Sequence, residues 1–207
     1  MEFIANAGIT LAAGLAHLRH MAEFPLHTRA TAPFDAKPFL DQAGQSIGYV
    51  PALLAQMAEA PALLEGYATL GAIFRKSGFS PLEQQLVLLA VSVEHQSRYC
   101  TPAHAARARA AELDEDAIDA IRENRGIDDP RLEALRAFTI RLVRARGDLA
   151  GAEVDAFLAA GFTHANALEI ILAIGLKTLS TYVSHIAQTP LDPPLIADAL
   201  TVGRRVA

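Results

Sequence analysis

Prolines that stand just ahead of apolar runs restrict the fold of this 207-residue chain more than any other feature. Proline suits the first turn of a helix and disrupts a helix interior, so a proline ahead of an apolar run marks a helix start. A further apolar helix is predicted from about His164 to Ala187. Hydrophobic residues make up 52% of the chain and aromatics only 6%, with Ala and Leu dominant, which favours helix over sheet. The sequence therefore predicts an all-α protein with helices that begin near Pro38, Pro51, Pro61, Pro81, Pro102 and Pro130.

The size of 22.1 kDa is sufficient for one domain with a sizeable core. We expect a helical extension over residues 1–23 and one helical domain over residues 24–207. A net charge of −5 supplies no basic field for nucleic acid, and neither a signal peptide nor a membrane span is supported, so no nucleic-acid or membrane partner is expected. A single cysteine fits a reducing compartment, which indicates the cytoplasm.

The segment from Gln85 to His104 holds the best candidates for chemistry. It contains Cys100, the only cysteine, at the predicted N-terminus of the helix that Pro102 opens. The positive end of a helix dipole favours a thiolate, and a thiolate is the reactive form of cysteine. His104 lies four residues later, on the same helix face, where it can act as the adjacent base. A buried, inert core thiol is the alternative for Cys100.

The segment from Ser97 to His104 resembles the C-x-Y-C-x-x-x-H motif of the alkylhydroperoxidase D-like and carboxymuconolactone decarboxylase families. Ser80 to Gln85, Gly161 to Thr163 and Thr181 to His185 also resemble the peroxidase-related branch of this group. The resemblance extends over roughly Phe24 to Asp192. It implies an alkylhydroperoxidase D-like helical bundle that assembles into homo-oligomers, as dimers, trimers or hexamers.

By matching position, the resemblance assigns catalytic roles to Cys100, His104 and Tyr99. Two positions depart from the family pattern: Ser97 replaces the first motif cysteine, and Gln85 replaces a relay glutamate. An amide can orient a partner but cannot act as a base near neutral pH. Glu94, the nearest carboxylate, is the candidate substitute relay, and a solvated or paired charge is its simpler interpretation.

Two short segments repeat one pattern ahead of apolar helices, Gly78-Phe79-Ser80 and Gly161-Phe162-Thr163. At the same offset Ser97 aligns with Ser180, whereas Cys100 aligns with Val183. The repetition is consistent with a duplicated helical unit and equally with a chance likeness between two buried helices.

The main functional hypothesis is an antioxidant oxidoreductase in which the Cys100 thiolate reduces a peroxide and is restored by an external thiol. No cofactor is implied, and no metal site is expected because the sequence offers only pairs such as Glu94 and His95. One alternative is a redox-silent sensor that binds a small apolar ligand. Another is a lactone decarboxylase-like enzyme that uses His104 as general base without the cysteine.

Overall fold

The computed structural model describes residues 23–200, and within this range all regular secondary structure is helical. The all-α prediction is confirmed. The predicted extension lies almost wholly outside the described residues. The helices are α2 (Lys37–Ile47), α3 (Ala52–Met57), α4 (Pro61–Phe74), α5 (Pro81–Glu94), α6 (Cys100–Ala110), α7 (Glu115–Arg122), α8 (Pro130–Arg144), α9 (Gly151–Ala159), α10 (His164–Ile186) and α11 (Ile196–Leu200), with short 3-10 turns η1 (Phe34–Ala36) and η2 (Pro193–Leu195).

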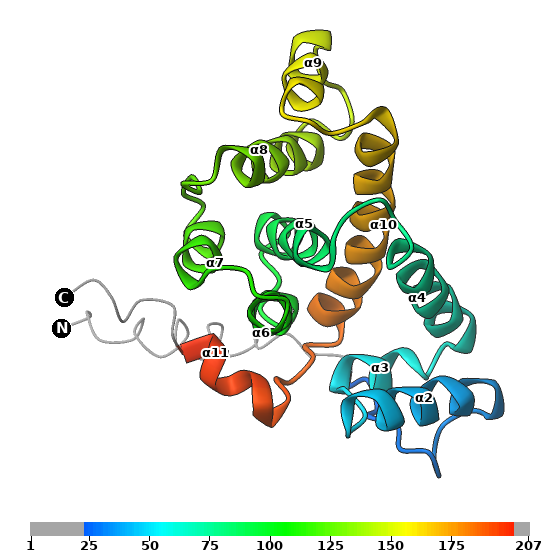
Figure 1. Ribbon diagram of the computed structural model, residues 1–207. Helices are drawn as coiled ribbons and strands as arrows, with labels where there is room; N and C mark the ends of the chain where they lie inside the picture. The colour runs from blue at the N-terminus through cyan, green and yellow to red at the C-terminus, as the bar shows by residue number, and fades with distance from the viewer. Residues whose placement is uncertain (1–22, 201–207) are drawn as a thin grey trace, which may run out of the picture.

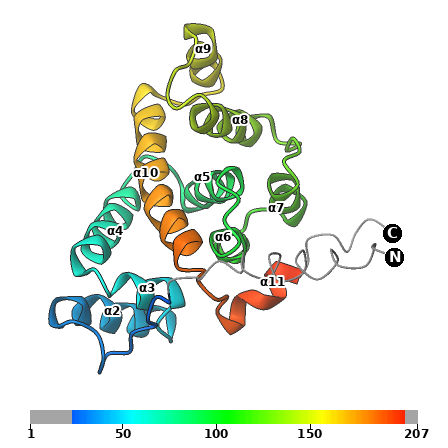
Figure 2. The same cartoon turned by 180° about the vertical axis from the view of Figure 1, so that it is seen from behind.

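Helix α5 is the centre of the fold. It packs against α6, α7, α8 and α10, which surround it in both views (Figures 1 and 2). Removal of apolar area from water is the main favourable contribution to folding, so a helix buried on nearly all sides is the core of the domain. Its fully buried side chains include Leu86, Val87, Leu89, Ala90 and Val91.

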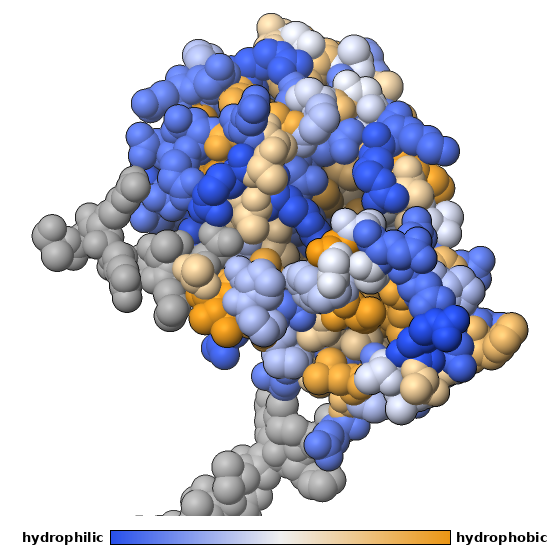
Figure 3. Space-filling model, turned by 60° about the horizontal axis from the view of Figure 1, so that its bottom comes forward, coloured by the Kyte–Doolittle hydropathy of each residue, from blue (hydrophilic) through white to orange (hydrophobic). Residues whose placement is uncertain are grey.

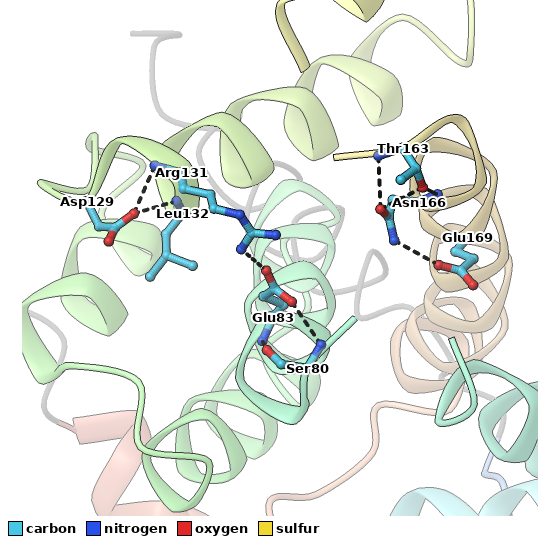
Figure 4. A network of polar contacts seen from close by, with 8 residues as sticks. All are labelled: Ser80, Glu83, Asp129, Arg131, Leu132, Thr163, Asn166 and Glu169. Carbon is cyan, nitrogen blue, oxygen red and sulfur yellow. Dashed lines mark hydrogen bonds and ion pairs between the residues drawn. The ribbon is translucent and has the colours of Figure 1, made fainter. Parts of the chain in front are cut away.

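The start of α5 is fixed by a capping box that also reaches α8. Ser80 accepts a hydrogen bond from the Glu83 backbone N–H at 3.3 Å, and the Glu83 carboxylate accepts one from the Ser80 N–H at 2.8 Å. Glu83 also pairs with Arg131 of α8, as Figure 4 shows. The Arg131 guanidinium lies 4.2 Å from the ring centroid of Phe162, ahead of α10. The capping box at the start of α5 thereby also contributes to the placement of α8 and of the segment that precedes α10.

The start of α10 repeats this arrangement. Thr163 accepts a hydrogen bond from the Asn166 N–H at 3.1 Å, and Asn166 Oδ1 accepts one from the Thr163 N–H at 3.0 Å (Figure 4). The rings of Phe79 and Phe162, which precede the two caps, lie 6.2 Å apart in the core. The two similar sequence segments therefore both cap the start of a helix, and their phenylalanine rings lie close together in the core.

The break between α5 and α6 is longer than the predicted one. Helix α5 ends at Glu94, three residues before the predicted end at Ser97, and Gln96 adopts a left-handed conformation with φ of 53°. Helix α6 begins at Cys100 itself. The chain therefore reverses direction in a turn that presents Ser97 and Cys100 to α10.

Helix α10 is long and apolar enough to cross a membrane by length and composition alone, and 39% of its most apolar window is buried within the described structure. It packs against α3, α4, α5 and α8, as a core helix does. Its outer face exposes four large apolar side chains, Leu168, Ile171, Tyr182 and Ile186.

The end of the molecule formed by α2, α3 and the segment before them also carries apolar surface. Leu26, Phe34 and Ile47 are exposed here, and Figure 3 shows apolar patches among polar ones on the face turned toward the viewer. The segment before α2 lies on α3 through His27, whose N–H donates to the Ala55 carbonyl at 3.2 Å.

Candidate functional site

Ser97 shapes the backbone around Cys100. Its hydroxyl accepts a hydrogen bond from the Cys100 N–H at 3.1 Å, and its carbonyl accepts one from the Thr101 N–H at 3.1 Å. The Ser97 Oγ also lies 3.3 Å from the Ser184 Oγ of α10. A hydroxyl at this position satisfies a free N–H at the first turn of α6 and holds that turn against α10.

The Cys100 sulfur is buried, with 2% of the residue exposed, but its surroundings are polar. The Ser180 Oγ of α10 lies 3.7 Å from the sulfur. Burial alone raises the pKa of the thiol. The nearby charge of Lys177, together with hydrogen bonds from Ser97, Lys177 and Ser180, outweighs burial, and the pKa of Cys100 is lowered. The site therefore favours a thiolate.

Lys177 is the cationic partner of this thiolate. Its side chain is 1% exposed, and burial lowers the pKa of its ammonium group, whereas the charge of Cys100 and a hydrogen bond to it act in the opposite direction. A buried ammonium requires an anionic partner, because an unpaired buried charge is costly. No carboxylate within the described range contributes to stabilising the Lys177 charge, and Cys100 is the group that favours the charged form of Lys177.

His104 does not supply the positive charge. Burial, with further contributions from Lys177 and Arg107, lowers the pKa of its imidazole well below the ordinary value. The ring is therefore neutral at pH 7, and its Nδ1 lies 3.0 Å from the Gln85 Oε1. The structure thus brings together Gln85 and His104, which the sequence identified separately as candidate site residues. Within the described contacts, the polar partners of the sulfur are Ser97, Ser180 and Lys177 in place of His104.

The Tyr99 hydroxyl, to which the family resemblance assigns a catalytic role, donates to the Asp192 Oδ2 at 2.5 Å. Burial first, and then the hydrogen bond and charge of Asp192, raise the pKa of Tyr99 far above its ordinary value. The other carboxylate oxygen of Asp192 accepts the Ala52 N–H at 2.9 Å. Tyr99 therefore ties the start of α6 to the segment after α10 and to α3.

Glu94, the predicted substitute relay, is held elsewhere. Both its carboxylate oxygens accept hydrogen bonds from Arg144 of α8, each at 2.7 Å. This bidentate pair joins the end of α5 to the end of α8. The paired-charge interpretation of Glu94 agrees with this geometry.

Two further side chains complete the surroundings. The Tyr67 hydroxyl of α4 hydrogen-bonds to Ser180, and burial, together with the charge of Cys100, raises the pKa of Tyr67 to about 12. Thr181, which is 1% exposed, has a hydroxyl with no hydrogen-bond partner within residues 23–200. The Tyr67 hydroxyl therefore shares Ser180 with the Cys100 sulfur, and Thr181 is the residue that follows Ser180 on α10. No group of three metal-ligating side chains occurs in the same part of the chain.

Sequence reasoning missed Lys177 and Ser180 because they lie about 80 residues after the motif. A signal was nevertheless present. Lys177 is the only lysine or arginine in the apolar helix from His164 to Ile186, and a lysine in such a helix is expected to be paired or functional. Ser180 was noted only as the position that aligns with Ser97.

Comparison with known proteins supports the family predicted from the sequence. Residues 58–140 match the model of the carboxymuconolactone decarboxylase family. No curated protein matches the chain in sequence. The matched region contains α4 to α7 and the whole Cys100 motif.

Solved structures extend the likeness to the whole described fold. An uncharacterised peroxidase-related protein with an alkylhydroperoxidase AhpD core from Ralstonia eutropha JMP134 superposes with a TM-score of 0.76 at 22% identity, covering 84% of this chain and 93% of that one. A peroxidase-related protein from Silicibacter sp. TM1040 gives 0.72 at 18% identity, covering 83% and 91%. The debrominase Bmp8, in a complex with 2,3,4-tribromopyrrole, gives 0.70 at 17% identity, covering 84% and 94%. The predicted alkylhydroperoxidase D-like fold is thereby confirmed.

Proposed function

We propose that this chain, which has the alkylhydroperoxidase D-like fold and a carboxymuconolactone decarboxylase family segment, is a thiol peroxidase that uses Cys100 as its only redox group. The observation that carries the proposal is the buried pair of Cys100 and Lys177, which favours the reactive form of sulfur. An inert core thiol would not need a buried ammonium beside it.

In the proposed reaction the Cys100 thiolate attacks one oxygen of the peroxide O–O bond. The sulfur–oxygen bond forms, the O–O bond breaks, and the products are a cysteine sulfenic acid and an alkoxide or hydroxide. Lys177 gives its proton to the departing oxygen, which leaves as alcohol or water. The Ser97 and Ser180 hydroxyls, which hydrogen-bond the thiolate, orient the sulfur before attack.

The burial of the sulfur restricts the substrate to small peroxides. Only 2% of Cys100 is exposed, so a peroxide reaches it through a narrow approach or a local opening of the surrounding helices. Hydrogen peroxide and small alkyl hydroperoxides are therefore the proposed substrates. The Thr181 hydroxyl, which has no partner within the described residues, is available to bind a peroxide oxygen.

The regenerating reductant in this proposal is external, since the chain has one cysteine. Ser97, in the position of the first motif cysteine, cannot form a disulfide and serves instead to hold the turn and the sulfur. We further propose a cytoplasmic homo-oligomer, for which the exposed apolar side chains on α10 are the supporting observation.

Two alternatives remain distinct from this proposal. A redox-silent ligand-binding protein is favoured by the burial of Cys100. The carbon-acid reaction with His104 as general base is disfavoured, because an imidazole whose pKa lies well below its ordinary value accepts a proton weakly at neutral pH.

The test is peroxide consumption by the purified protein with an excess of a small dithiol. The proposal predicts turnover in the wild type, loss of turnover in Cys100→Ser, and retention in Ser46→Ala, a control at an exposed serine of α2. Absence of peroxide consumption by the wild type, with Cys100 unmodified after treatment, contradicts the proposal.

A further inference from the structure

The pairing of one buried thiol with one buried amine raises the question of what happens to Cys100 after it is oxidised. The chain offers no second cysteine to form a disulfide, and an external thiol reaches a sulfur that is 2% exposed only through a local opening, which is slower than reaction with a side chain already beside the sulfur. The nucleophilic side chain that shares the pocket is the amine of Lys177.

We propose that Lys177 captures oxidised Cys100 as a sulfenamide, a covalent S–N bond that joins α6 to α10. This inference rests on the proposed function and goes beyond it, since it gives Lys177 a role in the fate of the oxidised sulfur. Sulfenic acids are known to condense with thiols or with nitrogen nucleophiles, and the outcome depends on which nucleophile is held in place.

The geometry of α10 brings Lys177 to the side of the helix that meets Cys100. The Ser180 Oγ lies 3.7 Å from the Cys100 Sγ, and Lys177 lies one turn earlier on the same helix face. The charge of Lys177 and a hydrogen bond from it both act on the Cys100 sulfur. The Lys177 side chain is 1% exposed, and packing keeps it from turning to solvent.

Oxidation itself prepares the amine for attack. In the resting site the charge of the Cys100 thiolate and its hydrogen bond favour the ammonium form of Lys177. A sulfenic acid is neutral, so this stabilisation disappears, and the remaining influences, burial and the charge of Arg107, both lower the pKa of Lys177. The proton has already left for the peroxide-derived oxygen, and the amine lone pair is free.

The two steps balance in atoms and charge. First, thiolate and ammonium react with a peroxide to give sulfenic acid, neutral amine and alcohol or water. Second, the amine nitrogen attacks the sulfenic sulfur, the S–O bond breaks, and one water leaves with a proton from the nitrogen. The sulfur is oxidised by two electrons, the peroxide is reduced by two electrons, and an external thiol later returns both by cleaving the S–N bond.

The bond would protect the site. A sulfenic acid that meets a second peroxide proceeds to sulfinic acid, which most cells cannot reverse, whereas a sulfur bound to nitrogen has no acid to oxidise. The single-cysteine site would therefore remain recoverable although it lacks a resolving thiol.

The experiment treats the wild-type protein with one equivalent of hydrogen peroxide, blocks free thiols, digests without reductant and analyses the peptides by mass spectrometry. The proposal predicts a product that joins the Cys100 peptide to the Lys177 peptide, with a mass about 2 Da below the sum of the reduced peptides, and its loss on treatment with a dithiol.

The matched variant is Lys177→Arg, which keeps a positive charge beside the sulfur but has no primary amine. With one equivalent of peroxide it is expected to give no cross-link, and with two or more equivalents it is expected to accumulate sulfinic acid, a gain of about 32 Da at Cys100, under conditions in which the wild type forms the cross-link. The wild-type peptide map decides the question by itself if this variant does not fold.

The outcomes separate the two proposals. A wild type that forms sulfenic or sulfinic acid without a link to Lys177 overturns the sulfenamide and leaves the peroxidase proposal standing. A wild type in which Cys100 stays unmodified overturns both. A cross-link that persists in Lys177→Arg would also contradict the assignment of Lys177.

Discussion

Replacing Lys177 with methionine removes the cation beside Cys100 while keeping an unbranched side chain in the same buried position. The Cys100 thiolate can then take up a proton and become a neutral thiol, so no unpaired charge is left in the core and the fold is expected to persist. Burial raises the pKa of Cys100, and the charge of Lys177 is the largest influence that lowers it. Without the ammonium group, the pKa of Cys100 should therefore rise. The thiolate fraction at neutral pH should fall.

The size of the effect follows from the charge pair. Two unit charges about 4 Å apart interact by about 4 kcal/mol at an effective dielectric constant of about 20, and about 1.4 kcal/mol corresponds to a tenfold change. Part of this is recovered by the Ser97 and Ser180 hydroxyls, which hydrogen-bond the thiolate. We therefore expect the rate of Cys100 alkylation at pH 7 to fall between about tenfold and a thousandfold in Lys177→Met.

The assay is alkylation by a small uncharged haloacetamide, followed by intact mass, with circular dichroism as a check of the fold. Two controls isolate the charge. Lys177→Arg keeps a cation and should alkylate within a few fold of the wild type, and Lys76→Met removes an exposed lysine after α4 and should have no effect. Equal alkylation rates in a folded Lys177→Met and the wild type at every pH would refute the charge-pair interpretation.

Three further outcomes are expected. Substituting Glu83 with glutamine weakens its contact with Arg131 and the capping box, so the free energy of unfolding at pH 7 should fall by about 1–3 kcal/mol. These contacts outweigh burial and lower the pKa of Glu83 in the folded state. The difference in unfolding free energy between the variant and the wild type, measured by chemical denaturation, should therefore be full above the unfolded pKa of about 4.3 and vanish as pH falls through the folded pKa. A difference that does not depend on pH would contradict this assignment. His104→Asn should leave the pH midpoint of Cys100 alkylation unchanged, because the imidazole is neutral. A large increase in that midpoint would instead identify His104 as the group that activates the sulfur. Ile171→Glu, on the exposed face of α10, should reduce the molar mass measured by light scattering, whereas an unchanged mass would exclude that face as an interface.

Local signals in the sequence were sufficient for most of the fold. Prolines and capping residues act within one turn of a helix, so the starts of α4, α5, α8 and α10 are correct to the residue or nearly so. The start of α6 at Cys100 also follows from a local signal, the proline two residues later. The ends are less certain because side-chain contacts elsewhere decide where a helix unwinds, as Gln96 shows.

The chemistry of the site could be predicted only in part. One sequence segment contains Cys100 at a predicted helix start, together with His104 and Gln85 as candidate site residues. The contact between His104 and Gln85 is seen only in the structure. Lys177, which lowers the pKa of Cys100, belongs to α10 and lies about 80 residues later in the chain. No local sequence pattern indicates which face of α10 packs against α6. The same limit explains Tyr99, whose hydroxyl is directed to Asp192 by the segment after α10.

The most direct test of the central claim is a pH titration of thiolate ultraviolet absorbance in the wild type, with Cys100→Ser as the reference. This measurement follows the protonation of the sulfur itself and does not depend on whether a reagent can enter the site. The lowered pKa of Cys100 predicts a transition at a lower pH than that of an unstructured cysteine peptide in the same buffer, and a transition that moves upward in Lys177→Met. A wild-type transition at or above that of the peptide would contradict the charge-pair interpretation.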